Sequence, residues 1–276
     1  MIDSMVIKDG VLHRANTVGF TPLTEGFAYG YGVFTTIKVN STRFCYFSEH
    51  YDRLARSAEA LDMFISRSKE QLLEDARSLL AVQGVLSGII KISILRQEGG
   101  SHCMLYLKST AAPERITEPQ RVVQSDVVRY SKAHHSLHKT HNYMENIIAL
   151  QQARNMGMDE AILLNENGEV TEACMSNLFI VQGEKLCTPR CSCGLLNGVA
   201  RSRILELAKG LDLRVMEGTY FPQDILKATE IFLTNSVRGV IPVGEFLSKR
   251  DKISYAGDIT KALSKLYMDD ESRNAV

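Results

Sequence analysis

Short segments of alternating apolar and polar residues dominate the first hundred positions. Residues 5–17 read as two strands joined by a turn at Asp9-Gly10, a dipeptide typical of hairpins. The β-branched run at 33–39 and the run at 89–96 read as longer strands. These patterns predict a sheet built from the N-terminal part of the chain.

Segments whose apolar residues have helical spacing lie between these strands. Residues 69–83 form one helical segment. Apolar residues at every third or fourth position before it predict another helix, whose buried stripe consists of Tyr51, Leu54, Ala58 and Leu61. An arginine in this helix, Arg53, lies off the stripe, where such a residue is usually solvated. Strands and helices therefore share the N-terminal region.

The stretch 139–179 combines a helix with a hairpin. Residues 142–156 have helical spacing, with apolar residues at Tyr143, Ile147, Leu150 and Met156. An apolar run at 161–164 is followed by the turn Asn165-Glu166-Asn167-Gly168 and then by a second short apolar run. We expect this turn to bring Glu172 back alongside the first strand.

The remaining pattern adds further strands and helices. A helix is predicted from near Val199 to Gly210, and residues 230–235 read as a strand that breaks into small polar residues. The segment 261–267 is helical, and residues 269–276 are predicted to fray. Residues 111–120 hold two prolines and few large apolar side chains, which favours a linker. The predicted organisation is an N-terminal α/β domain over 1–113, a linker over 114–121 and a second domain over 122–276.

Charge balance narrows the functional classes. The 276 residues include 32 basic and 32 acidic side chains, so the formal net charge is zero. General nucleic-acid binders and membrane-surface proteins rely on excess positive charge, so we expect neither partner. No apolar stretch reaches about 18 residues, and acidic residues stand near the N-terminus where a signal peptide has basic ones. The chain is expected to be soluble and cytoplasmic.

Cysteines and histidines do not form a recognisable metal pattern. Cys187, Cys191 and Cys193 cluster, but no second cysteine or histidine pair accompanies them. Four histidines near Lys139 do not share one helix face, and they are His134, His135, His138 and His141. Reduced thiols and no metal site are expected.

The stretch 139–179, KTHNYMENIIALQQARNMGMDEAILLNENGEVTEACMSNLF, resembles the fold-type IV pyridoxal-phosphate enzymes. These include aminodeoxychorismate lyase and the branched-chain and D-amino-acid aminotransferases. A lysine precedes the helix, and a glutamate follows about 33 residues later in the pattern VTEACMSNLF. Four more segments resemble family segments in the same order: FAYGYGVFTTIKV (27–39), EHYDRLARSAEAL (49–61), GLLNGVARSRILELA (194–208) and EIFLTNSVRGVIPV (230–243).

The resemblance implies a fold, a cofactor and a partner. The fold is the α+β fold of D-amino-acid aminotransferase-like enzymes, with two domains, the second of them barrel-like. The cofactor is pyridoxal 5'-phosphate, expected between the domains. A homodimer is implied, in which a loop of the partner subunit helps to close the substrate pocket.

The resemblance also assigns roles to single residues. Lys139 would bind the cofactor's aldehyde, and Glu172 would pair with its ring nitrogen. A guanidinium and the amides of a helix N-terminus are natural phosphate ligands. The residues implied for the rest of the cofactor site are Arg53, Asn177, Val199, Ala200, Asn235 and Ser236.

Thr36 favours one activity within the family. The FTT sequence at 34–36 resembles the lyase, where a threonine at this position stands near the substrate. The expected reaction is conversion of 4-amino-4-deoxychorismate to 4-aminobenzoate and pyruvate, a step of folate biosynthesis. The alternative is an aminotransferase acting on branched-chain L-amino acids or D-amino acids with a 2-oxo acid acceptor. Thr36 has an equally good interpretation as a strand residue whose hydroxyl binds backbone.

Several positions depart from the family pattern. Glu25 stands where the family usually has arginine, and Gly30-Tyr31-Gly32 replaces GDG. Ala200 replaces a threonine common in aminotransferases. After Gly99-Gly100 a lyase often has an arginine for a substrate carboxylate, but here Ser101 follows. The candidate substrate residues are Tyr31, Arg96 and His102, with Arg238 as a further source of positive charge.

Overall fold

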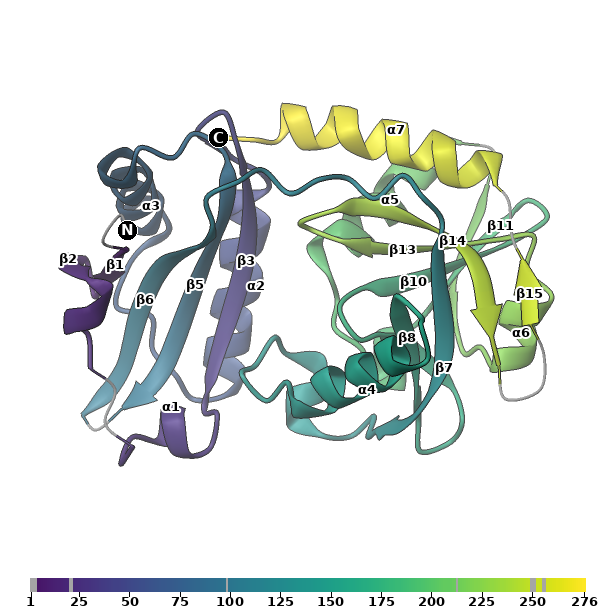
Figure 1. The fold of residues 1–276 in the computed structure, drawn as a ribbon, viewed down its shortest axis with the longest axis horizontal. Helices are drawn as coiled ribbons and strands as arrows, with labels where there is room; N and C mark the ends of the chain where they lie inside the picture. Colours follow the sequence, from purple (N-terminus) through teal and green to yellow (C-terminus); the bar gives the residue numbers. More distant parts are fainter. Residues whose placement is uncertain (1–3, 20–21, 98, 212, 249–251, 255–256) are drawn as a thin grey trace. The chain divides into compact units, whose positions relative to one another are not determined.

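The computed structural model describes residues 4–19, 22–97, 99–211, 213–248, 252–254 and 257–276. The chain packs as two compact units, which are drawn in Figure 1. Unit 1 comprises Met1–Pro113, His138–Asn142 and Glu271–Val276. Unit 2 comprises Glu114–Leu137 and Tyr143–Asp270.

Unit 1 is built on an antiparallel sheet. Its strands are β1 (Met5–Lys8), β2 (Val11–Arg14), β3 (Gly32–Asn40), β4 (Arg43–Phe44), β5 (Gly88–Gln97) and β6 (Gly100–Ser109). Within the described residues they form one six-stranded sheet in the order β2-β1-β6-β5-β3-β4. Its helices are α1 (Glu25–Ala28), α2 (Phe47–Ala60) and α3 (Lys69–Gln83), with a 3-10 turn at Ala15–Thr17. The predicted hairpin, strands and helices of this region are confirmed.

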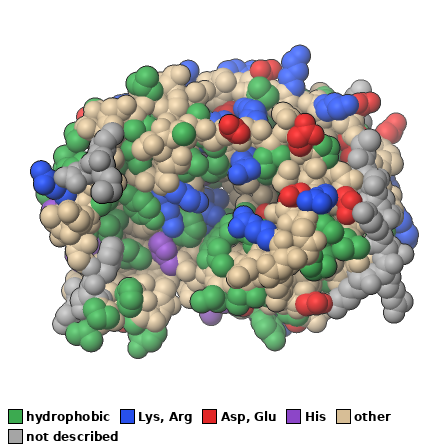
Figure 2. All heavy atoms as spheres, viewed as in Figure 1, with side chains coloured by type: hydrophobic (Ala, Val, Ile, Leu, Met, Phe, Trp, Pro, Cys, Tyr) green, Lys and Arg blue, Asp and Glu red, His purple; other side chains and the backbone are tan. Residues whose placement is uncertain are grey.

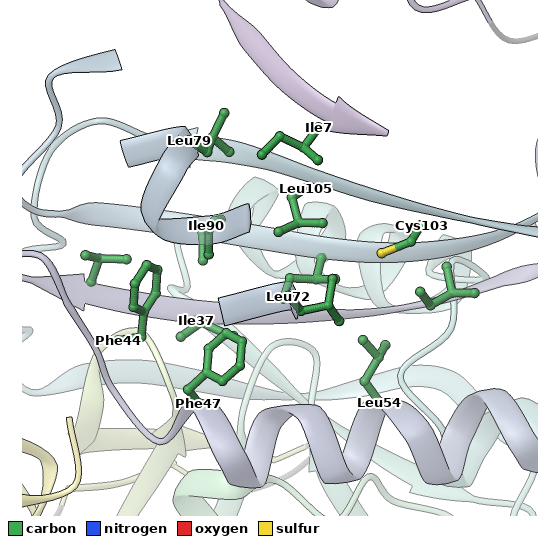
Figure 3. Close-up of a cluster of buried hydrophobic side chains, with 14 of the residues drawn as sticks. Ile7, Ile37, Phe44, Phe47, Leu54, Leu72, Leu79, Ile90, Cys103 and Leu105 are labelled. Atoms are coloured by element: carbon green, nitrogen blue, oxygen red, sulfur yellow. The ribbon is translucent and has the colours of Figure 1, made fainter. Parts of the chain in front are cut away.

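Helices α2 and α3 contribute to the hydrophobic core on one face of this sheet, as Figure 3 shows. Ile37, Ile90 and Leu105 point from the strands toward Leu54 of α2 and Leu72 of α3. Successive strand residues face opposite sides of a sheet. Because Val33 and Ile37 face this core, the residues between them at even positions of β3 face the other side.

Two distant segments complete unit 1. Thr140 forms an antiparallel bridge with Val33 in β3. Val276 and Asn274 accept hydrogen bonds from the backbone of Phe44 and Tyr46, at 2.8 and 3.1 Å. The prediction that 269–276 fray is therefore wrong. The reason is that β4 is an edge strand whose backbone groups these residues satisfy.

A buried ion pair also fixes this C-terminal segment. Lys38 Nζ lies 2.7 Å from Glu271 Oε2, and both side chains are less than one-tenth exposed. Removing either partner would leave a buried charge unpaired, a large cost. The segment from Glu271 onward is thus an integral part of unit 1.

Unit 2 contains a mixed sheet. Its strands are β7 (Gln120–Arg129), β8 (Glu160–Asn165), β9 (Val170–Ala173), β10 (Asn177–Gln182), β11 (Lys185–Pro189), β12 (Arg214–Gly218), β13 (Glu230–Asn235), β14 (Gly239–Leu247) and β15 (Lys252–Ser254). In the part of the chain that the structure describes, eight follow the order β12-β11-β10-β13-β14-β7-β8-β9, and β15 pairs with β14. Ala173 N donates to Ser176 O (2.8 Å), which links the end of β9 to the segment before β10. The last strand of this order, β9, thus lies near β10, the third strand from the other end, and the sheet curls into half of a barrel (Figure 1).

Helices connect the strands of unit 2. They are α4 (Met144–Asn155), α5 (Val199–Ala208), α6 (Pro222–Leu226) and α7 (Asp258–Arg273), with 3-10 turns at His134–Leu137 and Cys191–Cys193. The predicted helices near 142–156 and 199–210 are confirmed, as is the hairpin with its turn at 165–168.

The buried face of α4 differs from the predicted stripe. Ile147 is 47% exposed and Met156 is 56% exposed. The buried residues are Asn146, Ala149, Leu150 and Ala153. Asn146 is buried because its Nδ2 donates to Cys174 O at 2.7 Å, which the apolar pattern could not show.

Three features of the described residues concern cysteines, possible metal ligands and possible membrane spans. Their six cysteines are free thiols. They include no group of three or more histidine, cysteine or acidic side chains that could hold a metal ion. Across the same residues, no helix has both the length and the apolar character that crossing a membrane requires. The face drawn in Figure 2 carries basic and acidic side chains together.

Candidate active site

Lys139 is fixed against the start of β3. Phe34 N donates to Lys139 O (2.8 Å), and His141 N donates to Gly32 O (2.9 Å). The Lys139 ammonium lies 4.8 Å from the centroid of the Phe34 ring. These contacts place the lysine alongside β3, next to the Phe34 ring.

A second lysine contacts the same ring. Lys91 pairs with Thr36 across β3 and β5, and its Nζ lies 3.8 Å from the Phe34 centroid. Burial, followed by the positive charges of Lys108 and Lys139, lowers the pKa of Lys91 to about 8. Among the described residues no carboxylate forms an ion pair with Lys91. The site therefore holds a half-buried cation without a counterion.

Thr36 lies on this same face. It stands two positions from Phe34 and directly opposite Lys91, so the three side chains point to one side of the sheet. Its hydroxyl makes no hydrogen bond to any residue that the structure describes. The backbone-bonded arrangement considered from sequence is therefore not what the structure shows.

Arg53 lies on the other side of β3, where it is only 8% exposed. Its Nη2 donates to Thr35 Oγ1 at 3.0 Å, and that oxygen lies 2.7 Å from His50 Nδ1. Burial, then Arg53 and Lys139, lowers the pKa of His50 well below its usual range. Thr35 Oγ1 thus accepts a hydrogen bond from Arg53 and shares a second one with His50. The arginine is thus built into the unit and is not solvated.

Glu172 is the centre of a buried network in unit 2. Its Oε2 accepts from Asn177 Nδ2 (3.0 Å) and Leu196 N (3.2 Å). Its Oε1 lies 3.2 Å from Arg129 Nη2, and both side chains are 8% exposed. Arg129 also donates to Gly194 O at 2.7 Å. The carboxylate is thus oriented by three donors, one of them cationic.

Asn177 connects this network to the N-terminus of α5. Its Nδ2 donates to Leu196 O at 2.8 Å. A Cβ on Gly198, the N-cap residue, would lie 2.2 Å from Asn177 Oδ1, so only glycine fits there. No side chain caps α5, and its first residues Val199 and Ala200 are buried. A buried, uncapped helix N-terminus favours an anion.

The strand β13 ends beside Asn177. Asn235 uses its Oδ1 to accept from Val237 N (3.1 Å) and Arg238 N (2.8 Å), and its Nδ2 donates to Ser176 Oγ (3.0 Å). Asn235 therefore shapes the turn that carries Ser236.

Two of the substrate candidates lie on the α2 face of unit 1. Tyr31 Oη donates to Leu61 O at 2.7 Å, and Arg96 Cζ lies 5.9 Å from the Tyr31 ring centroid. Arg96 Nη1 donates to Asp62 O (2.9 Å), and its Nε lies 3.4 Å from Glu25 Oε2. The structure brings Tyr31 and Arg96 together, but on the opposite face of the sheet from Phe34.

Ser101 and His102 occupy opposite faces of β6. Ser101 pairs with Arg96 and lines, with that arginine, a pocket of about 600 Å³ beside α2. His102 Nδ1 lies 2.6 Å from Asp9 Oδ2. Both expected cations, Arg96 and His102, thus have an acidic neighbour.

Sequence reasoning missed Arg129 and Lys91. Arg129 ends the strand β7, and only the pairing of β7 with β8 and of β8 with β9 brings it to Glu172. Lys91 was detectable as the one cation that interrupts the strand IIKISIL, but its position opposite Thr36 required the register. The local sequence pattern does not show which strands pair or in which register.

The two groups of residues fit pyridoxal 5'-phosphate. The cofactor needs an amine for its aldehyde, a carboxylate for its ring nitrogen and donors for its phosphate. Unit 1 offers Lys139 and Arg53. Unit 2 offers the buried Glu172, the uncapped start of α5 and the buried hydroxyl of Thr234, which has no hydrogen-bond partner within the described part of the chain.

Known proteins resemble the whole chain. It is 28% identical over 277 residues to aminodeoxychorismate lyase of Bacillus subtilis, covering 95% of this chain and 93% of the relative. It is 26% identical over 263 residues to D-alanine aminotransferase of Listeria monocytogenes, covering 90% of each.

Its fold matches that of the branched-chain aminotransferase of the thermophilic archaeon Thermoproteus uzoniensis, solved with norvaline. The TM-score is 0.90 at 22% identity, with 99% of this chain and 98% of that one covered. The family model "Amino-transferase class IV" matches residues 32–246. The chain therefore belongs to the amino-transferase class IV family of pyridoxal-phosphate-dependent enzymes.

Proposed function

We propose that the enzyme is a 4-amino-4-deoxychorismate lyase that forms 4-aminobenzoate and pyruvate. The observation that carries this proposal is the arrangement of Thr36 and Lys91 on the face that holds the Lys139–Phe34 contact. A proton donor and an unpaired cation suit a substrate that carries carboxylates and loses an enolpyruvyl group. The similarity to the Bacillus subtilis lyase supports the same choice.

The residues proposed to hold the cofactor come from several separate segments of the sequence. Lys139 and Arg53 would bind the aldehyde and the phosphate. Glu172 would pair with the ring nitrogen, with Asn177 holding its carboxylate in place. The amides of Val199 and Ala200, together with Asn235 and Ser236 at the end of β13, would bind the phosphate. When bound, the cofactor withdraws electrons from the carbon that bears the substrate's amine.

The chain's own residues would then move two protons. The amine of Lys139 takes the proton from the ring carbon bearing nitrogen. The ring becomes aromatic as its bond to the enolpyruvyl oxygen breaks. The Thr36 hydroxyl supplies, directly or through water, the proton that the enolpyruvyl methylene needs to become the methyl group of pyruvate. Lys91 would hold a carboxylate of the substrate meanwhile.

An assay with the purified protein and added cofactor tests the proposal. Release of 4-aminobenzoate and pyruvate in equal amounts from aminodeoxychorismate is the expected result. A panel of branched-chain L-amino acids and D-amino acids with 2-oxoglutarate or pyruvate is run beside it. Faster turnover of that panel would identify an aminotransferase and overturn the lyase assignment.

Substituting Thr36 by valine tests its role as proton donor. Valine keeps the shape of threonine and removes only the hydroxyl. Release of pyruvate should slow by ~10²–10⁴-fold, the usual contribution of general acid catalysis, with the cofactor still bound. Any side transamination serves as the internal control and should change little. Equal loss of both activities, or no loss, would remove Thr36 from the mechanism.

Lys91 gives the reaction a pH dependence. Its ammonium loses its proton, and with it the positive charge, as the pH rises through about 8. The value of kcat/KM, which reports free-enzyme groups, should therefore fall above about pH 8. The Lys91→Arg variant stays charged and should not show this fall. An unchanged alkaline limb in the arginine variant would exclude Lys91 from substrate binding.

We also propose that the enzyme works as a homodimer in the cytoplasm. Large apolar side chains are exposed around α1, at Leu23, Phe27 and Tyr29, and the free cysteines suit a reducing compartment. A monomer in sedimentation at micromolar concentration would contradict the dimer.

A further inference from the structure

Thr234 has an unusual hydroxyl. The residue is 1% exposed in β13, and its Oγ1 has no hydrogen-bond partner among the residues that the structure describes. Thr188, equally buried in the same sheet, donates its hydroxyl to Leu178 O at 2.7 Å. A buried hydroxyl without a partner destabilises the fold, so its retention calls for an explanation.

The strand register fixes where this hydroxyl points. Thr234 pairs with Asn177 across β13 and β10, so the two side chains are neighbours on one face of the sheet. The Asn177 side chain contacts Leu196 O, and its Oδ1 fills the place that a Cβ on Gly198 would need. Thr234 therefore faces the loop that leads into α5.

The N-terminus of α5 is an independent feature of the same place. The helix has ten residues and begins at Gly198 without a side-chain cap. Its first amide groups and its dipole favour a bound anion. Ala200, in the first turn, has no hydroxyl to add to these amides.

We propose that Thr234 donates its hydroxyl to the phosphate monoester of the cofactor at the N-terminus of α5. This inference rests on the proposed placement of the phosphate at Val199 and Ala200. Thr234 supplies from β13 the hydroxyl that position 200 lacks. In this role Thr234 is a cofactor-binding residue, and the phosphate is the hydrogen-bond partner that its buried hydroxyl otherwise lacks.

Substitution by valine separates this role from a structural one. Cofactor-free Thr234→Val protein is titrated with pyridoxal 5'-phosphate and, separately, with pyridoxal, which has no phosphate. A hydrogen bond to a charged group contributes enough that affinity for the phosphorylated form should fall about 10-fold to 100-fold. Affinity for pyridoxal should stay unchanged, and Thr234→Ser should restore phosphate binding.

Thermal unfolding gives a second readout. Removing an unpartnered buried hydroxyl should raise the melting temperature of the cofactor-free Thr234→Val protein, although its phosphate affinity falls. The matched control is Thr188→Val, which loses a bonded hydroxyl. It should lower the melting temperature and leave the ratio of the two affinities unchanged. If the Thr234→Val protein does not fold, the affinities for the two ligands are compared in the Thr234→Ala protein instead.

The possible outcomes are distinct. An unchanged affinity ratio in Thr234→Val, or an equal loss for both ligands, overturns the inference. A changed ratio in an enzyme that shows no lyase turnover overturns the proposed lyase activity and leaves the role of Thr234 intact.

Discussion

Replacing Lys139 by alanine is expected to lower turnover by about 10⁴-fold or more. In the proposed mechanism, this substitution removes the amine that binds the cofactor's aldehyde and carries a proton, and proton transfer alone typically contributes ~10²–10⁴-fold. The backbone bond from Phe34 N to Lys139 O does not depend on the side chain, so unit 1 should stay folded. Steady-state release of 4-aminobenzoate and the visible absorption of the bound cofactor measure the two losses.

A surface lysine provides the control for this substitution. Lys209 is exposed and pairs with Glu206 on α5, so Lys209→Ala should retain full activity. Borohydride reduction should fix the cofactor to wild-type protein and not to the Lys139→Ala variant. Fixation in that variant, or turnover near the wild-type rate, would show that another amine performs the reaction.

Substituting Glu172 by glutamine should slow turnover by about 10²–10³-fold, the usual loss for a preorganised electrostatic group. It should also lower stability. The carboxylate accepts from Asn177 and Leu196 on one oxygen and faces Arg129 with the other. Glutamine has one acceptor oxygen, and it leaves the Arg129 charge buried without a counterion, at a cost of about 3–5 kcal/mol.

A double variant separates the two losses. Glu172→Gln combined with Arg129→Gln removes both charges and allows the two amides to bind each other. Its free energy of unfolding should recover much of the loss seen in Glu172→Gln, whereas its turnover should remain low. Recovery of turnover along with stability would show that Glu172 acts only through the fold, and denaturant titration beside the lyase assay distinguishes these results.

The local pattern predicted most elements of both sheets. The spacing of Leu54 and Ala58 identified α2, and the turn at 165–168 identified the β8–β9 hairpin, because both depend on neighbouring residues. Features that depend on distant residues were missed. The buried face of α4 follows from the bond between Asn146 and Cys174, and the ordered C-terminal segment follows from β4.

The candidate site divides in the same way. Lys139, Glu172 and Arg53 were predicted from the resemblance because each lies in a continuous motif. The residues that contact these candidates lie outside the motifs. Arg129 reaches Glu172 through strand pairing, and Lys91 reaches Thr36 through the register of β3 with β5. The pairing of charges in a buried site therefore depends on tertiary structure. A single sequence shows such a pair only where one motif includes both the acidic and the basic residue.

The composition of unit 1 has a consequence for the order of synthesis. Its sheet needs residues 138–142 beside β3 and residues 271–276 beside β4. Chains emerge from the ribosome N-terminus first. Residues 114–137 of unit 2 must therefore be translated before the first-made sheet can acquire Lys139, and the whole of unit 2 before Glu271 can neutralise Lys38. A nascent chain arrested before residue 271 would display the open edge of β4, and chaperones that recognise exposed strand edges would meet it there.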